Sequence, residues 1–311
     1  MPRTCIAFLV LGLASTVAVA AGDDTAIAPG AGTAVYLSKD NEEFYTQRIA
    51  AEYLPRFGHG DSLTGVRYTA HYYEQAPWSR RGEQVAFLYR DIDPATANGW
   101  QLDAGAFQQG GHAMLTLDGS YRKPLAERTA LELFVDREWV ETADALDKGV
   151  HFTLAGGGVE QGFGPHVTVI GLAGYQDFSD GNSRNHGRVR LIVQPNLDLG
   201  LTLQARYRVY TSSSDDVGGA YFNPSRYDES MLAIGWRQRL LGWTGRFIAG
   251  AGRQHVAEDP WTPTRLLEIG VQSPAIHAYS LRARAGYNQS AAFNGPDYRY
   301  RYLFGELIIG F

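Results

Sequence analysis

Several short stretches in the second half of the chain carry two arginines separated by one residue, among them 188–190, 206–208, 237–239 and 282–284. In an extended strand, residues i and i+2 point to the same side, so each pair would present both guanidinium groups on one face. Arginine offers several hydrogen-bond donors and no acceptor, which suits an anionic or hydroxyl-rich solute. The alternative is structural, with each arginine paired to an acid across neighbouring strands. The predicted solute-binding residues are Arg188, Arg190, Arg206, Arg208, Arg237, Arg239, Glu268, Arg282 and Arg284.

Two turn-rich stretches, DFSDGNSR (177–184) and GGAYFNPSRYDE (218–229), are predicted to be loops. The aromatic side chains of the second stretch could stack on a sugar ring, or they could pack against the protein and shape the turn. The oxygen ligands of the first stretch could hold Ca²⁺, but their spacing departs from an EF-hand loop. The predicted loop residues are Asp177, Asp180, Asn182, Arg184, Tyr221, Phe222, Asn223, Pro224 and Tyr227.

Residues with catalytic potential do not form a pattern that enzymes use. The stretch GHGDS (58–62) contains His, Asp and Ser, but they are nearly consecutive turn residues, whereas a triad is defined by geometry. The histidines show no spacing typical of metal ligands. We therefore predict no catalytic residue, no metal and no cofactor, and the chain is not expected to be an enzyme.

The arginine pairs lie in segments that alternate between apolar and polar residues. In LTLQARYRVY (201–210), Leu203 and Val209 fall on one parity, and Arg206 and Arg208 fall on the other. This period of two predicts a strand with one apolar face. About 16 such segments, with a range of 14–16, follow one another from residue 32. Only ETADALDKG (141–149) has a helical pattern.

The alternation, the connections and the chain end together predict a membrane barrel. In the second half, long connections (177–187, 212–229, 257–264 and 291–299) alternate with short ones, as in outer-membrane barrels. The chain ends on the apolar strand YLFGELIIGF, and we interpret its last residue, Phe311, as a membrane-insertion signal. The predicted fold is an all-β, transmembrane, antiparallel up-and-down β-barrel of about 16 strands, with its arginines facing a polar lumen.

The N-terminal sequence and the overall charge indicate where the protein is located and which partners it does not bind. A basic residue, the apolar segment 5–21 and small residues before Ala21 predict a cleaved signal peptide over residues 1–21. A short flexible segment, 22–31, and the barrel, 32–311, would follow. The only cysteine, Cys5, lies in the signal. A net charge of −5 argues against nucleic-acid binding.

The two loop motifs resemble those in the C-terminal barrel of exopolysaccharide-export porins, the poly-N-acetylglucosamine and cellulose secretion channels. The match comprises Asp180-Gly181-Asn182 with Arg184, and Tyr221-Phe222-Asn223-Pro224 with Tyr227. It covers roughly the second half of the chain. Members of that family carry periplasmic tetratricopeptide repeats ahead of the barrel, whereas only residues 22–31 separate the predicted signal from the predicted barrel here.

The resemblance implies an outer-membrane channel for a polysaccharide or another polar solute, in a Gram-negative bacterium with the C-terminus in the periplasm. The expected partners are outer-membrane lipid and lipopolysaccharide, the barrel-assembly machinery during insertion, an exopolysaccharide, and a separate periplasmic scaffold or inner-membrane synthase. The alternative is a plugged or narrow surface barrel that acts as a receptor, adhesin or assembly partner through its loops.

Overall fold

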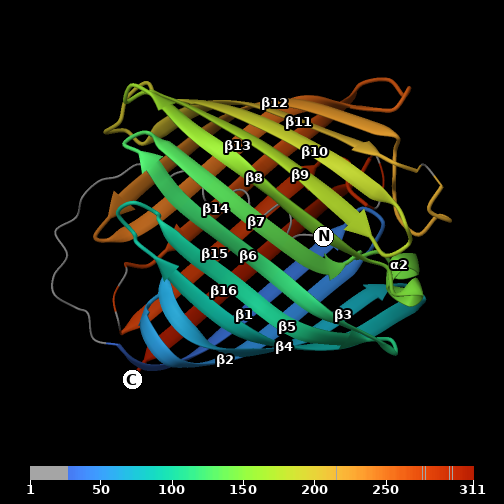
Figure 1. Cartoon of the computed structure of the whole chain (residues 1–311), viewed down its shortest axis with the longest axis horizontal. Helices are drawn as coiled ribbons and strands as arrows, with labels where there is room; N and C mark the ends of the chain where they lie inside the picture. The colour runs from blue at the N-terminus through green and yellow to red at the C-terminus, as the bar shows by residue number, and fades with distance from the viewer. Residues whose placement is uncertain (1–26, 215, 275, 277, 294, 296) are drawn as a thin grey trace.

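Sixteen antiparallel strands close into one barrel, which confirms the predicted fold class (Figure 1). The computed structural model describes residues 27–214, 216–274, 276, 278–293, 295 and 297–311, so the predicted signal peptide (1–21) lies outside the described residues. The strands are β1 (Ala28–Asp40), β2 (Tyr45–His59), β3 (Ser62–Gln75), β4 (Trp78–Ile92), β5 (Gly99–Gln109), β6 (His112–Ala126), β7 (Thr129–Trp139), β8 (His151–Phe163), β9 (Val167–Phe178), β10 (Ser183–Val193), β11 (Leu201–Ser212), β12 (Arg226–Leu240), β13 (Trp243–Val256), β14 (Thr262–Gln272), β15 (Tyr279–Gln289) and β16 (Arg299–Gly310).

Each strand pairs with its neighbours in sequence, and β1 pairs with β16 to close the barrel. Gly30 lies opposite Gly310, and the backbone N–H of Phe311 donates to the carbonyl of Pro29 at 2.9 Å. Because β16 runs to Gly310, β1 extends back to Ala28, four residues before the predicted start of the barrel. We call the end of the barrel that holds Ala28 and Phe311 the terminus rim, and the opposite end the loop rim.

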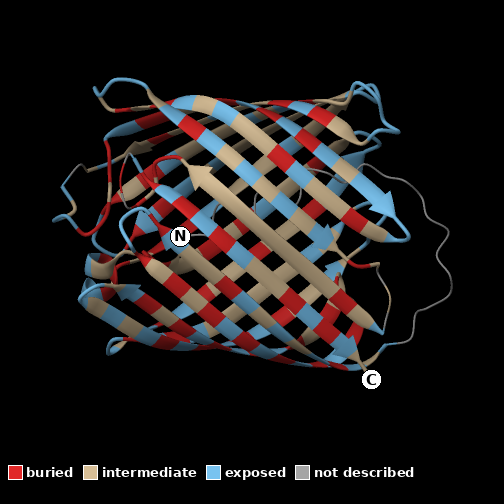
Figure 2. Ribbon diagram, turned by 180° about the vertical axis from the view of Figure 1, so that it is seen from behind, coloured by how far each residue is buried: buried red, intermediate tan, exposed pale blue. Residues whose placement is uncertain are grey.

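Along the middle of the strands, apolar side chains such as Leu232 face outward and charged side chains such as Arg67 face inward. Leu232 and Ile234 on β12 are 72% and 51% exposed, whereas Arg67 and Glu52 are 7% and 5% exposed. Figure 2 shows this alternation of buried and exposed residues along the strands. A chain folding in water would leave such apolar surface unburied, so the distribution matches a barrel surrounded by lipid. Among the described residues, no helix has both the length and the apolarity to span a bilayer.

A charge on the outward face should cost stability according to its depth in the membrane. Leu232 lies near the middle of β12, so we expect Leu232→Arg to destabilise the inserted barrel by about 2–4 kcal/mol. Leu203 is the third residue of β11, near the terminus rim, and Leu203→Arg should cost about 0–1 kcal/mol. Urea titration of both variants refolded into phospholipid vesicles measures the difference; equal costs would contradict the assigned depth.

The connections differ from the predicted rhythm because the strands are longer than expected. The predicted loop 177–187 is only the turn Ser179–Asn182, since β9 runs to Phe178 and β10 starts at Ser183. The predicted loop 257–264 is likewise shortened by β14. The loop rim nevertheless holds three longer connections: 140–150, 213–225 and 290–298.

The helix predicted near 141–149 is present as α2 (Ala143–Lys148). Thr142 caps its N-terminus by accepting a hydrogen bond from the N–H of Ala145, and Gly149 ends it in the left-handed region at φ 69°. Both are the usual residue types at these positions, because a hydroxyl satisfies a free N–H and glycine adopts positive φ without strain. The helix lies at the loop rim (Figure 1).

Candidate functional site

A wall of arginines lines the lumen on the strands from β10 to β15. Alternation places Arg188 and Arg190 of β10 and Arg206 and Arg208 of β11 on the inward face. The register sets like charges directly opposite one another, because Arg188 pairs with Arg208 and Arg190 pairs with Arg206. We call seven of the inward arginines of these strands the arginine wall: Arg188, Arg190, Arg206, Arg208, Arg237, Arg246 and Arg284.

One member of the wall, Arg246, was not predicted. It lies directly opposite Arg237 across β12 and β13, and Gly270 separates it from Arg284 on β15. The sequence signal was weak because β13 has apolar Ile248 on its inward side, so the two faces of that strand differ little in polarity. Arg237, Arg246 and Arg284 form a second group of inward arginines nearer the terminus rim, whereas the arginines of β11 lie opposite Met231 and Glu229 of β12.

The inward faces of β10 to β15 supply only two carboxylates, Glu229 and Glu268. Glu229 accepts a hydrogen bond from Arg208 at 2.6 Å, and the hydroxyl of Tyr302 donates to Glu268. Directly opposed like charges destabilise a sheet. The arginine wall therefore carries more positive charge than the two carboxylates on the same strands neutralise.

Tyr227, predicted as a loop residue, lies inward near the start of β12 and is fully buried. Its hydroxyl accepts from Arg208 at 2.8 Å and donates to Glu229 at 2.7 Å. Ser290 also accepts a hydrogen bond from Arg208, at 2.7 Å. This network fixes Arg208 at the loop-rim end of the arginine wall. A loop position for Tyr227 would instead have left the tyrosine side chain in solvent.

The opposite wall has balanced charges. Arg67 on β3 donates to Glu52 and to Asp103, both at 2.6 Å. Glu306 lies within 3.6–3.9 Å of three arginines, Arg67, Arg90 and Arg282. In buried ion pairs of this kind each charge is neutralised by its partner, so this part of the lumen carries no excess positive charge.

Two of the predicted lumen arginines therefore differ from the rest. Arg282 donates to the carbonyl of Gly60 at 2.9 Å and to Asp61 at 2.6 Å, so it holds the β2–β3 turn against β15. This turn belongs to the GHGDS stretch (58–62), whose Gly60 and Asp61 bind Arg282 and so have a structural role. Arg239 is exposed near the end of β12 at the terminus rim, and does not lie in the enclosed lumen.

A packed cluster of side chains lies across the loop-rim mouth. Phe293, from the connection after β15, packs against Phe152 and Phe178 of β8 and β9, with ring centroids 5.9 Å apart in both cases. In a 16-strand barrel these strands lie about half-way round from β15 and β16, so the connection crosses the mouth. We call this cluster the mouth plug, comprising Phe134, Val140, Ala145, Val150, Phe152, Leu154, Phe178, Ala220, Tyr221 and Phe293.

Arg184 ties the plug to the wall. It lies on β10, not in the loop predicted for it, and its guanidinium carbon is 4.9–5.5 Å from the ring centres of Phe178, Tyr210, Tyr221 and Phe293. Nε donates to Oδ1 of Asn223 at 3.0 Å, and Nη2 donates to the carbonyl of Phe222 at 2.7 Å. Cation–π contacts and charged hydrogen bonds thus hold the 213–225 connection inside the mouth.

The predicted loop motifs meet in this structure. Asn182 donates to the hydroxyl of Tyr221 and to Oδ1 of Asn223, both at 3.0 Å. Tyr221, 5% exposed, and Pro224 are buried, which favours the packing alternative over an open sugar-stacking surface. Burial raises the pKa of the Tyr221 hydroxyl above its ordinary value. Asp177 is exposed on the outward side of β9, away from buried Asn182, so the two do not share a cation site.

A second attachment lies across the mouth. Arg48 of β2 forms a buried ion pair with Glu141, next to α2, and the hydroxyl of Tyr73 donates to Glu141 at 3.0 Å. Burial raises the pKa of Glu141, and the adjacent Arg48 guanidinium acts in the opposite direction and lowers it. The buried pair joins β2 to the 140–150 connection at the mouth.

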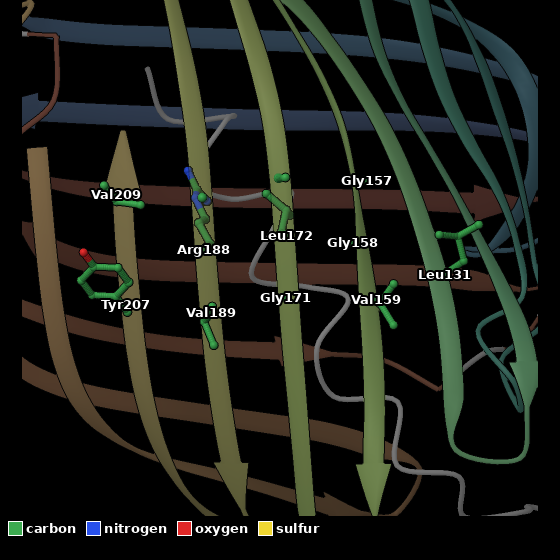
Figure 3. A pocket seen from close by; sticks show the side chains of 12 residues that line it. Leu131, Gly157, Gly158, Val159, Gly171, Leu172, Arg188, Val189, Tyr207 and Val209 are labelled. Atoms are coloured by element: carbon green, nitrogen blue, oxygen red, sulfur yellow. The ribbon is translucent and has the colours of Figure 1, made fainter. Parts of the chain in front are cut away.

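An apolar hollow of about 480 Å³ spans β7 to β11 on the outside of the wall (Figure 3). Gly157 and Gly171 form its floor, and exposed Val159, Val189 and Tyr207 flank it. Val159, Val189 and Tyr207 belong to the outward set, so the hollow opens on the outside of the barrel, although Arg188 of the arginine wall also lines it.

The chain is similar in fold to solved outer-membrane barrels. It matches a bacterial polysaccharide outer membrane secretin with 12% identity and a TM-score of 0.65, over 91% of this chain and 98% of that protein. It also matches OmpT, an outer membrane protein of Vibrio cholerae (8% identity, TM-score 0.43, 94% and 100% coverage), and OccK5 of Pseudomonas aeruginosa (9% identity, TM-score 0.42, 94% and 100% coverage). No family model matches the chain. No curated protein matches its sequence.

Proposed function

We propose that this protein is an outer-membrane channel of a Gram-negative bacterium that passes an anionic or hydroxyl-rich polymer, with its termini in the periplasm. The observation that carries the proposal is the arginine wall, in which arginines lie directly opposite arginines on facing strands. A fold gains no stability from such an arrangement. A solute that brings negative charge or many hydroxyl oxygens would offset it.

The polymer that fits best is a polysaccharide. The fold is shared with a polysaccharide outer membrane secretin, and the Asp180–Arg184 and Tyr221–Tyr227 motifs resemble those of exopolysaccharide-export porins. A separate periplasmic scaffold or an inner-membrane synthase would then deliver the polymer. Insertion would use the barrel-assembly machinery, with Phe311 at the end of the recognised strand.

The mouth plug favours a second candidate function. Aromatic side chains pack across the loop rim, in the path that a polymer would take, as expected for a surface barrel that acts as a receptor, adhesin or assembly partner. The two functions differ in one respect, because a channel must release the plug and a surface barrel need not. Conductance therefore separates them.

The test is single-channel recording of the purified barrel in planar lipid bilayers. A channel should show open events, at least transiently, with the current carried mainly by anions because of the arginine wall. Adding an acidic polysaccharide should block that current at lower concentration than a neutral polysaccharide of similar length. A barrel that stays silent, and that remains silent after the plug contacts are broken, would overturn the channel and leave the surface function.

A further inference from the structure

We propose that the outward face of β14, β15, β16 and β1 at the loop rim binds the phosphorylated headgroup of a multiply acylated lipid. Four cations, Lys39, Arg265, Arg299 and Arg301, form this site, which we call the outer basic patch. The site is separate from the lumen and independent of whether the barrel conducts.

Strand alternation and register place these cations side by side. Arg301 shares its face with Leu303 and Ile309, which are 51% and 52% exposed, so it points outward. Lys39 lies directly opposite Arg301 on β1. Gln289 lies opposite both Arg265 and Arg299, so these two arginines are two strands apart, a backbone separation of about 10 Å.

Counter-charges on the protein do not neutralise the patch. No carboxylate among the described residues forms an ion pair with Arg265, Arg299 or Arg301, and only Lys39 has one, with Glu43. The exposed acids at outward strand positions near the same rim, Glu74, Glu83 and Asp177, lie on β3, β4 and β9. Exposed Glu258, Asp259 and Asp297 lie in the connections next to the patch, and in the described part of the chain they form no ion pair with it. Opposed cations such as Arg301 and Lys39 repel each other unless an anion lies between them.

The surroundings select a lipid over a free anion. Towards the terminus rim, the outward faces of both strands continue from the patch with exposed apolar residues. These include Leu267 and Ile269 on β14 and Leu303 and Leu307 on β16. A phosphate group at the patch would therefore place acyl chains against an apolar wall. Arginine and lysine at a membrane surface attract anionic headgroups. Arg265 and Arg299 are about 10 Å apart, two strand spacings, so a headgroup with two or more phosphates could bridge them.

Binding can be measured with the folded protein and a diphosphorylated, acylated glucosamine disaccharide, the phosphorylated lipid of the outer leaflet. Native mass spectrometry of detergent-solubilised protein would count bound lipids. We expect the wild type to retain this lipid, and Arg265→Glu with Arg301→Glu to weaken binding at least tenfold. The lumen variant Arg190→Glu with Arg206→Glu makes the same change in net charge on the other side of the wall, and should bind like the wild type.

Further measurements distinguish a lipid phosphate from free phosphate, and a second variant replaces the first if the first does not fold. The dephosphorylated lipid should bind weakly, and inorganic phosphate in excess should not displace the phosphorylated lipid. If the glutamate variant fails to fold, Arg265→Gln with Arg301→Gln takes its place and should still lose binding. Equal binding by the outer and lumen variants, or by lipid with and without phosphate, would overturn the proposal, as would binding of inorganic phosphate alone.

Discussion

Replacing Arg190 and Arg206 with glutamate is expected to shift the charge selectivity of the open barrel from anions towards cations. The two side chains face each other on β10 and β11 in the lumen. Arg206 donates only to Gln204 among the described residues, at 2.7 and 3.1 Å, so its replacement breaks no ion pair. Arg208 is unsuitable for this test, because it is bound to Glu229 and Tyr227.

The expected size follows from Coulomb's law. Two unit charges 10 Å apart in water interact by about 0.4 kcal/mol, and the double replacement changes the wall by four charges. A permeating ion would therefore feel about 1.7 kcal/mol before screening, a change on the order of tenfold in its permeability. Reversal potentials in a salt gradient measure this ratio.

The matched control is Arg190→Lys with Arg206→Lys, which keeps both charges and should keep anion selectivity. Screening predicts a further result, because raising the salt concentration to about 1 M shortens the Debye length to about 3 Å and should reduce the difference between the variants. An unchanged reversal potential in a conducting glutamate variant would refute the arginine wall as the selectivity element.

The wall was largely visible in the sequence because strand alternation is a local signal. LTLQARYRVY shows both faces of β11 within ten residues, and the structure places Arg206 and Arg208 on the inward one. Whether these residues touch a polymer stays a prediction. What alternation could not show is register, which depends on contacts between strands. The direct opposition of Arg190 to Arg206, and of Arg237 to Arg246, is a property of pairing alone.

The plug was not predictable for a different reason. Phe293 and Tyr221 lie in irregular connections more than seventy residues apart, and nothing in their own neighbourhoods indicates that they meet at Phe178. The stretch DFSDGNSR is rich in turn residues, which predicts a loop position for Arg184. Strand pairing with β9 and β11 overrides that local preference and turns the arginine toward four aromatic rings.

Removing Arg184 is expected to release the mouth plug and raise conductance. Arg184→Ala deletes the donors to Asn223 and Phe222, and hydrogen bonds from a charged donor contribute about 1.5–3 kcal/mol each. It also removes the cation that four rings surround. The barrel itself should persist, because its closure depends on backbone pairing around sixteen strands. We expect longer and larger open events than in the wild type.

Limited proteolysis gives a readout that does not depend on ion flow. The connection 213–225 should become susceptible to cleavage in Arg184→Ala, while folded barrels should keep their heat-resistant migration on gels. Asn185→Ala is the matched control, since Asn185 is the next residue of β10 and is exposed on the outward side. A variant whose connection is cleaved readily but whose current stays at the wild-type level would show that the plug does not limit the path.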